Sequence, residues 1–308
     1  MVLMVSIIFA LLVGSGFYGY GSDFYSAYYK SNLAWGGLFN RLGWGISTLT
    51  INGIHLGVQL VTLILSLSAG FLIREHIKFK NTYSIVFFLL IYITAIHTWP
   101  IIMSTSNAMR QGLAMSFIFL SFVAGARKNF FWMFFFSFLS IFMHGTGLIL
   151  FMNIVFAYFI NHFLSDYTYK RKALINFIIG TFLLVSAYFF LNIITLSGNI
   201  ESSRIIGGDF RAAFVSIGII YIALSFFNKS ILSNTFNLTL YYFSFLAPTL
   251  LLNELNWQYE RLGMMMIIPY ILSFGIILNR SSYQMYTIFI FFALLFLTIY
   301  MGMYSSLV

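Results

Sequence analysis

Long apolar segments alternate with short polar breaks along the whole chain of 308 residues. An apolar run of about 17–25 residues is long enough for a helix to cross a bilayer. The pattern predicts eleven such helices, whose ends are defined only to within a few residues. The predicted spans are 1–19, 46–73, 82–102, 111–126, 129–144, 146–163, 173–196, 212–227, 235–252, 263–278 and 284–303.

Two segments of this pattern are ambiguous. The block 129–163 is one continuous apolar run, and we divide it at "FMHGTG" because Gly145, Gly147 and a histidine favour a chain reversal there. The N-terminal "MVLMVSIIFALLVG" has no basic region and no small-residue cleavage site followed by a soluble domain. We therefore interpret it as the first span rather than as a cleaved signal peptide.

The composition agrees with a membrane protein. The chain is 61% hydrophobic and 7% charged, and its mean hydropathy is +0.93. We predict an all-α polytopic membrane protein in which residues 1–308 form a single transmembrane domain with no soluble domain. The chain has no Cys, which excludes disulfides, thiol catalysis and thiolate metal sites.

The net charge of +9 is explained by membrane sidedness rather than by nucleic-acid binding. We predict a cytoplasmic N-terminus, because ten of the 16 Lys and Arg residues then fall in cytoplasmic breaks, as the positive-inside rule expects. These breaks are 74–80, 127–128, 170–172, Lys229 and Arg280.

The expected external loops carry charges of both signs and would form the active face. They comprise about 20–45, 103–110, 197–211 and 253–261. Four arginines lie in these loops or at the neighbouring helix ends: Arg110, Arg204, Arg211 and Arg261. A planar guanidinium binds phosphate oxygens bidentately, so these side chains together would suit a lipid-linked diphosphate. Each one alone could instead reach lipid headgroups or pair with a nearby acid.

Three residues are candidates for proton transfer. His144 stands at an outer break between long apolar runs, and an imidazole can act as a base or donate a hydrogen bond to phosphate. A lone histidine at a helix end is more often structural. Asp23 and Glu260 are external acids that could serve instead. No His, Asp and Glu cluster has metal-ligand spacing, so we predict no bound metal and no cofactor.

Aromatic and amide side chains near these charges are candidates for sugar binding. Tyr and Trp rings suit sugars, but they also form ordinary interfacial belts. The loop "NELNWQYERLG" contains Trp257 and Tyr259 and mixes acids, bases and rings most densely. In "STSNAMRQGLAMSF", Asn107 and Gln111 would share one helix face with Arg110 because of their spacing.

The segment Ser104 to Phe151 resembles the EpsG/Wzy group of bacterial polysaccharide polymerases. It runs from an N-x-x-R-Q-G-x-A helix start, through a basic turn, to an apolar span that ends in F-x-H. An early G-S-D-F-Y and a late Y-E-R-L extend the likeness weakly over most of the chain. The family's arginine corresponds to Arg110 and its histidine to His144. The R-x10-G element of some other O-antigen polymerases is absent, so a mechanism built on it is not supported.

The resemblance implies a metal-independent glycosyltransferase of GT-C-like architecture in the bacterial inner membrane, with its active face in the periplasm. Such enzymes transfer a glycan from undecaprenyl diphosphate to the sugar end of another lipid-linked repeat unit. The implied partners are the lipid-linked donor and acceptor, membrane lipid and a chain-length regulator. Fixed arginines would stabilise charge on the leaving diphosphate, while a carboxylate or imidazole accepts the proton of the attacking hydroxyl. A single displacement would invert the anomeric centre.

Two alternatives stay open. An O-antigen ligase uses the same lipid-linked donor but transfers the glycan to the lipopolysaccharide core. A flippase or transporter for the same lipid would place charged residues near mid-membrane along a path open to both sides. Most charges in this chain lie outside the predicted spans, which favours an enzyme.

Overall fold

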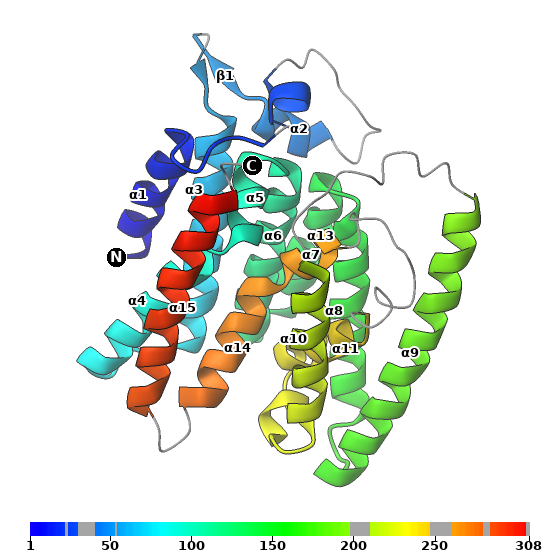
Figure 1. The fold of residues 1–308 in the computed structure, drawn as a ribbon. Helices are drawn as coiled ribbons and strands as arrows, with labels where there is room; N and C mark the ends of the chain where they lie inside the picture. The colour runs from blue at the N-terminus through cyan, green and yellow to red at the C-terminus, as the bar shows by residue number, and fades with distance from the viewer. Residues whose placement is uncertain are drawn as a thin grey trace. The chain divides into compact units, whose positions relative to one another are not determined.

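The structure is a computed structural model that describes residues 1–21, 24–29, 41–52, 54–197, 210–246, 260–279 and 284–305. These residues form fourteen α-helices, one two-stranded hairpin and two short irregular helical turns (Figure 1). The prediction of an all-α fold is confirmed, with the small hairpin as an addition to it. The helices are α1 Val2–Gly14, α2 Arg41–Ser47, α3 Gly57–His76, α4 Thr82–Ile96, α5 Trp99–Ser106, α6 Met109–Ala126, α7 Phe130–Met143, α8 Thr146–Phe163, α9 Tyr169–Ser197, α10 Phe210–Ser225, α11 Thr235–Leu246, α13 Glu260–Met265, α14 Ile267–Asn279 and α15 Gln284–Ser305. The turns are η1 Phe24–Tyr28 and η3 Lys229–Leu232, and the strands are β1 Thr50–Ile51 and β2 Ile54–His55.

Every predicted span overlaps at least one of these helices. Among the described residues, α3, α6, α8 and the Tyr169–Phe189 part of α9 are long and apolar enough to cross a membrane. The pair α4 and α5 makes a fifth crossing if it counts as one span bent by 56°. Further apolar helices, such as α1 and α7, are shorter, and α15 counts among them over Tyr286–Thr298. The chain is therefore a multi-pass membrane protein, while eleven spans and their orientation stay predictions.

The division of the apolar block 129–163 is confirmed, since α7 ends at Met143 and α8 begins at Thr146. The predicted start of the span 46–73 is wrong, because the end of α2 and the hairpin occupy residues 46–55. Thr50 pairs with His55 and Ile51 with Ile54. The local sequence "TINGIH" places β-branched residues around Asn-Gly, which favours a tight hairpin over a helix.

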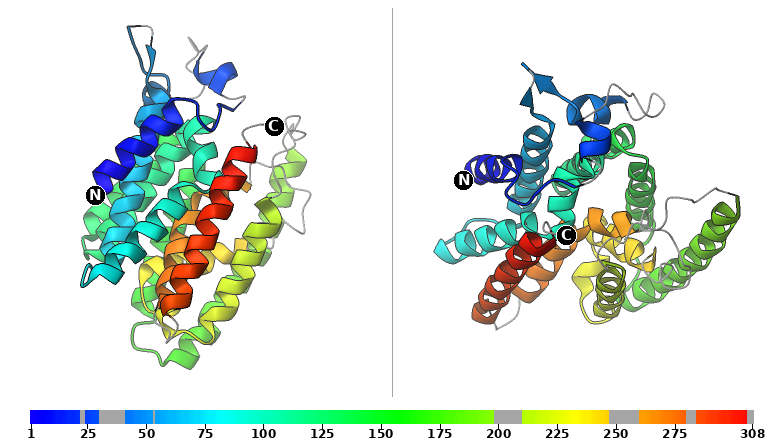
Figure 2. Two further views of the ribbon diagram at one scale, coloured as in Figure 1. Left: turned by 60° about the vertical axis from the view of Figure 1, so that its left-hand side comes forward. Right: turned by 45° about the horizontal axis from the view of Figure 1, so that its top comes forward.

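The described residues divide into two compact units. Unit 1 comprises Met1–Phe151 and Ile267–Val308, and unit 2 comprises Met152–Met266. In unit 1, α3 packs against α1, α4, α5 and α6, and α6 also packs against α7 (Figures 1 and 2). In unit 2, α11 packs against α9 and α10.

Polar hydrogen bonds join the apolar helices of unit 1. The Tyr92 hydroxyl of α4 donates to the Ser66 carbonyl of α3 at 2.9 Å and lies 2.7 Å from the Ser6 hydroxyl of α1. A Cβ at Gly70 would lie 3.0 Å from Cζ of the same tyrosine, so the small residue allows the helices to approach. Small residues and buried hydroxyls are typical of helix contacts inside membranes, where apolar burial alone gives little preference for one partner.

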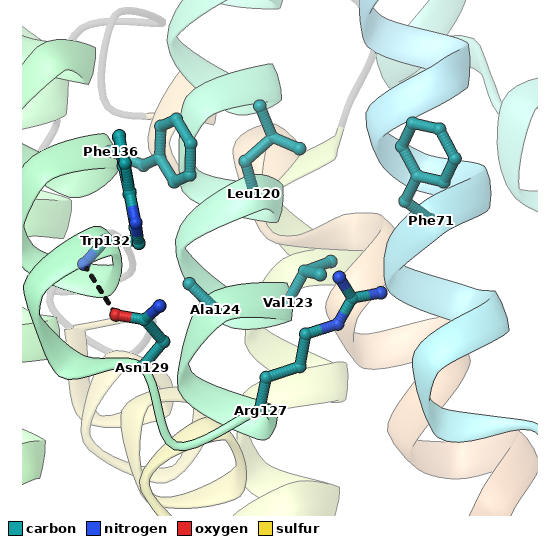
Figure 3. Close-up of a pocket in the computed structure, with 8 residues that line it drawn as sticks. All are labelled: Phe71, Leu120, Val123, Ala124, Arg127, Asn129, Trp132 and Phe136. Carbon is teal, nitrogen blue, oxygen red and sulfur yellow. Dashed lines mark hydrogen bonds between the residues drawn. The ribbon is translucent and has the colours of Figure 1, made fainter.

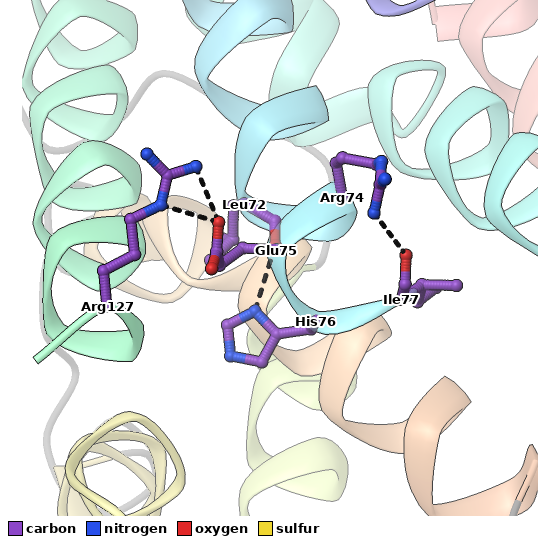
Figure 4. A network of polar contacts seen from close by, with 6 residues as sticks. All are labelled: Leu72, Arg74, Glu75, His76, Ile77 and Arg127. Carbon is purple, nitrogen blue, oxygen red and sulfur yellow. Dashed lines mark hydrogen bonds and ion pairs between the residues drawn. The ribbon is translucent and has the colours of Figure 1, made fainter. Parts of the chain in front are cut away.

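The C-terminal ends of α3 and α6 are joined by an ion pair (Figure 4). Arg127, just after α6, contacts the Glu75 carboxylate through Nη2 at 2.7 Å and Nε at 2.8 Å. Arg74 in the last turn of α3 donates from Nη1 to the Ile77 carbonyl at 3.2 Å. Cations at helix C-termini complement the helix dipole. We call this part of unit 1, with residues 74–80 and 127–128, the basic end.

Unit 2 is held by similar contacts around α11. The amide Nδ2 of Asn153 in α8 donates to the Thr239 carbonyl at 3.1 Å. The Tyr242 hydroxyl of α11 bonds to Asn176 of α9. Helix α13 packs against α10, where Gly263 lies directly on the ring of Phe214. These contacts place the starts of α10 and α13 in one unit.

Candidate functional site

The short helix α2 covers the starts of α3 and α6 and the end of α7. A Cβ built on Gly43 would lie 2.6 Å from the Met143 carbonyl oxygen and 3.3 Å from Cγ of Arg110. The Met143 carbonyl oxygen and Cγ of Arg110 thus both lie close to Gly43, although Met143 and Arg110 belong to different helices. Only a residue without a side chain allows this approach. The structure therefore brings Arg110 next to the turn that leads into His144, and we call this part of unit 1 the Arg110 site.

Arg110 is half-buried in the first turn of α6. Its guanidinium carbon lies 4.2 Å from the centre of the Trp44 ring, and its Nε is buried. Within the described part of the chain, this Nε has no hydrogen-bond partner and no acid forms an ion pair with Arg110. A cation at a helix N-terminus also faces the positive end of the dipole, which costs about 0.3–1 kcal/mol. The protein's own contacts thus leave this charge poorly compensated.

Two further donors on α2 are buried, one of them on the Trp44 ring that Arg110 contacts. Among the residues that the structure describes, Trp44 Nε1 and the Ser47 hydroxyl have no hydrogen-bond partner. The two residues are three apart on α2, so they share one face of it. Indole and guanidinium N–H groups can only donate, and buried donors without an acceptor are rare in proteins. The Arg110 site is therefore suited to a ligand rich in oxygen acceptors, such as a phosphate or a sugar.

His144 caps the C-terminus of α7 in an extended conformation, with φ −158° and ψ 141°. Its Nδ1 lies 2.7 Å from the Thr146 hydroxyl and accepts the Thr146 backbone N–H at 3.3 Å. A backbone N–H can only donate, so Nδ1 is the acceptor and a neutral ring carries its proton on Nε2. To act as a base through Nδ1, His144 would first have to break its contact with Thr146. The geometry therefore argues against Nδ1 as the base.

The two candidate amides do not share a helix face, so that prediction was wrong. Asn107 ends α5 with φ −131° and ψ −63°, and α6 begins only at Met109. The hydroxyls of the preceding "STS" bond to carbonyls three or four residues earlier, an arrangement that favours helix ends. Asn107 instead lies directly against Gly21, while Gln111 is buried in the first turn of α6. Their role in sugar binding stays a prediction.

The remaining site candidates fall where the structure describes no side chain. Asp23, Arg204, Trp257 and Tyr259 lie outside the described residues. Arg211, Glu260 and Arg261 lie in the first turns of α10 and α13, and only their backbone is described. A shared site of four arginines therefore stays a prediction. In the described part of the chain, no three His, Asp or Glu side chains come together as a metal site.

The sequence patterns did not single out Trp44, Gly43 or Thr146. Trp44 lies in "LGWGIS", where a large ring stands between two glycines in an expected external loop. Only the first glycine is required by packing, because a Cβ at Gly43 would meet the Met143 carbonyl whereas one at Gly45 would meet nothing within 4 Å. Trp44 is 8% exposed, and the Tyr28 ring lies 5.0 Å from its ring. The contact between Trp44 and Arg110 connects positions far apart in the sequence, which periodicity cannot detect.

The hairpin next to α2 contains a half-buried histidine, His55, whose ring nitrogens are both buried. The His55 ring lies 5.1 Å from the Phe24 ring, and neither ring nitrogen has a partner of acceptable geometry among the described residues. Burial lowers the pKa of His55 below its ordinary value of 6.5, and the backbone of Tyr28 and Ser47 offsets only part of this effect. His55 is therefore neutral at neutral pH and packs as an aromatic ring.

Comparisons with known proteins found no match to this chain among family models, curated proteins or solved structures. The family resemblance thus rests on the motif residues themselves. Two of these residues, Arg110 and His144, lie at the same end of unit 1 although they come from different helices.

Proposed function

We propose that this protein is a polysaccharide polymerase of the O-antigen type in the bacterial inner membrane. It transfers a glycan from an undecaprenyl-diphosphate-linked donor to a lipid-linked acceptor on the periplasmic face, within a GT-C-like architecture. One observation carries the proposal. Arg110 is half-buried over Trp44 at the positive end of α6, and no acid among the described residues pairs with it. A bound anion would compensate this charge, and a diphosphate leaving group is such an anion.

The proposed reaction needs charge stabilisation rather than a metal. The bond between the anomeric carbon and the diphosphate oxygen breaks, and the electron pair leaves with the diphosphate. Arg110 stabilises the growing charge because its side chain is already held in place by Trp44. The acceptor hydroxyl attacks the opposite face of the sugar and gives its proton to a base, so the anomeric centre inverts.

The proton donor and the base are separate groups in this scheme. His144 donates through Nε2 to an oxygen of the donor substrate, in line with its tautomer. The candidate bases are then Asp23 and Glu260. Three arginines complete the diphosphate clamp: Arg204, Arg211 and Arg261.

The test uses purified protein in detergent with a lipid-linked repeat unit and no added metal. A polymerase produces a ladder of longer lipid-linked oligosaccharides, and the ladder persists in EDTA. A flippase produces no ladder. A folded preparation that leaves the repeat unit unchanged would refute the proposal.

A second assay separates the polymerase from the ligase. In cells that lack the polymerase, the lipopolysaccharide core carries a single repeat unit. In cells that lack a ligase, the core carries none. The proposal predicts the single-repeat pattern after deletion of this chain, and restoration of long polymer when the intact chain is returned.

A further inference from the structure

A groove lies between α3, α6 and α7 at the basic end of unit 1 (Figure 3). Its volume is about 420 Å³, within the range of about 300–1,000 Å³ that small-molecule sites occupy. Its walls are mainly aromatic and aliphatic side chains, among them Phe71 of α3, Leu120 and Val123 of α6, and Trp132 and Phe136 of α7. The groove is therefore suited to a hydrocarbon chain.

The mouth of the groove carries hydrogen-bond donors. Arg127 and Asn129 line it, and the Arg127 side chain is 63% exposed despite its ion pair. The Nη2 and Nε contacts of Arg127 both go to one oxygen of Glu75, which leaves three of the five guanidinium N–H groups for another acceptor. The Asn129 Oδ1 accepts the Trp132 backbone N–H at 3.4 Å, so its amide nitrogen is a further donor. An oxyanion at the mouth would meet both residues.

The basic end, to which the mouth of the groove belongs, carries mostly positive charges. The basic end contains Arg74, Lys78, Lys80, Arg127 and Lys128 against one acid, Glu75. Basic residues beside a membrane attract anionic phospholipids. Trp132 is 44% exposed in the first turn of α7, and tryptophan prefers the headgroup level of a bilayer. The apolar groove suits the acyl chain of a lipid, and its cationic mouth at the headgroup level suits an anionic headgroup.

We propose that this groove binds an anionic phospholipid. The phosphate contacts Arg127 and Asn129, and an acyl chain lies against Phe71, Trp132 and Phe136. Glu75 competes with the phosphate for Arg127 and so limits the affinity. This proposal does not depend on the proposed polymerase activity, because the groove lies at the other end of α6 from Arg110.

The test measures lipid contact with Trp132 in nanodiscs of phosphatidylcholine and phosphatidylglycerol. One lipid at a time carries brominated acyl chains, which quench tryptophan fluorescence on contact. The Trp132 signal is the difference between the intact protein and Trp132→Phe. We expect the brominated phosphatidylglycerol to be preferred about fivefold, the effect of roughly one cation at an anionic surface. Equal quenching by the two lipids would overturn the proposal.

Three variants distinguish lipid binding from a purely structural ion pair. Arg127→Gln should abolish the preference for the anionic lipid, whereas Glu75→Gln should increase it because the competing carboxylate is gone. Arg171→Gln removes another exposed arginine, in the first turn of α9, and should leave the preference unchanged. If Glu75→Gln and Arg127→Gln both leave the lipid preference unchanged, the ion pair serves only the fold and the proposal fails.

Discussion

Replacing Arg110 with alanine separates a ligand-binding role from a structural one. The contact with the Trp44 ring at 4.2 Å stabilises the fold by about 0.5–2 kcal/mol, depending on how far the pair is desolvated. The position at the start of α6 destabilises it by about 0.3–1 kcal/mol. These contributions have opposite signs and similar sizes. Arg110→Ala should therefore change the free energy of unfolding by less than about 2 kcal/mol.

The effect on activity should be much larger. Removing one positioned donor that stabilises transition-state charge slows an enzyme by about 10²–10³-fold. The rate of ladder formation from lipid-linked repeat units should fall by about that factor in Arg110→Ala. The melting temperature and the amount of protein in the membrane are measured on the same preparation. Normal ladder formation by Arg110→Ala would refute the role assigned to Arg110.

Arg74 provides a matched control, because it makes a similar ring contact at the basic end. Its guanidinium carbon lies 4.0 Å from the Phe79 ring centre, and it also donates to the Ile77 carbonyl. It stands in the last turn of α3, where the helix dipole favours a cation. Arg74→Ala should thus lower stability more than Arg110→Ala and leave ladder formation unchanged. An equal loss of activity in both variants would show that the assay reports the state of the fold.

The other predictions concern three residues around Arg110. Trp44→Leu should reduce ladder formation by about tenfold, because the contact of about 1–2 kcal/mol that positions Arg110 is lost. Trp44→Phe keeps an aromatic ring and should retain part of the activity. Equal rates of ladder formation in the two variants would contradict this role of Trp44. His144→Ala should lower the rate of ladder formation by about 10–100-fold, the value of a hydrogen bond to a charged group. His144→Gln keeps an N–H donor and should lower the rate less. If His144 were the base instead, both variants would lose the same activity. The folded-state pKa of His55 lies below its unfolded value of 6.5, so stability is greatest above that pH and declines as the pH falls below it. Melting temperatures at about pH 7.5 and 5.5 should show this decline in the intact protein and a smaller one in His55→Gln, with the exposed His162→Gln as control.

Helix positions follow from apolar periodicity because each span satisfies its own backbone hydrogen bonds. The break between α7 and α8 at His144–Gly145 could also be predicted from local sequence, because glycines and a histidine interrupt the apolar run there. The hairpin was missed although its signal was local. Asn52-Gly within "TINGIH" is a strong turn pattern. The isoleucines on either side of it, however, made the segment look like the start of the following apolar span.

The Arg110 site depends on contacts that no local pattern contains. Gly43 lies against the carbonyl of Met143, one hundred residues later, and Trp44 lies under Arg110. The motif N-x-x-R-Q-G-x-A singled out Arg110 as a candidate, but its spacing suggested one continuous helix. The break at Asn107 separates the amide from that helix and leaves Arg110 in the first turn. That change of position is what gives the arginine its unfavourable electrostatic surroundings.

Helix direction distinguishes arginines that sequence alone treats as equal. Arg74 and Arg127 stand at the C-terminal ends of α3 and α6, where carbonyls and the Glu75 carboxylate compensate their charge. Arg110 stands at the N-terminal end of α6, about 27 Å away along a helix of 18 residues, without such a partner among the described residues. A charge that the fold does not compensate is retained at a cost, and a ligand anion would offset that cost. The proposed substrate site at Arg110 rests on this lack of compensation, whereas the proposed lipid site at the basic end rests on the groove beside Arg127 and on the exposure of that side chain.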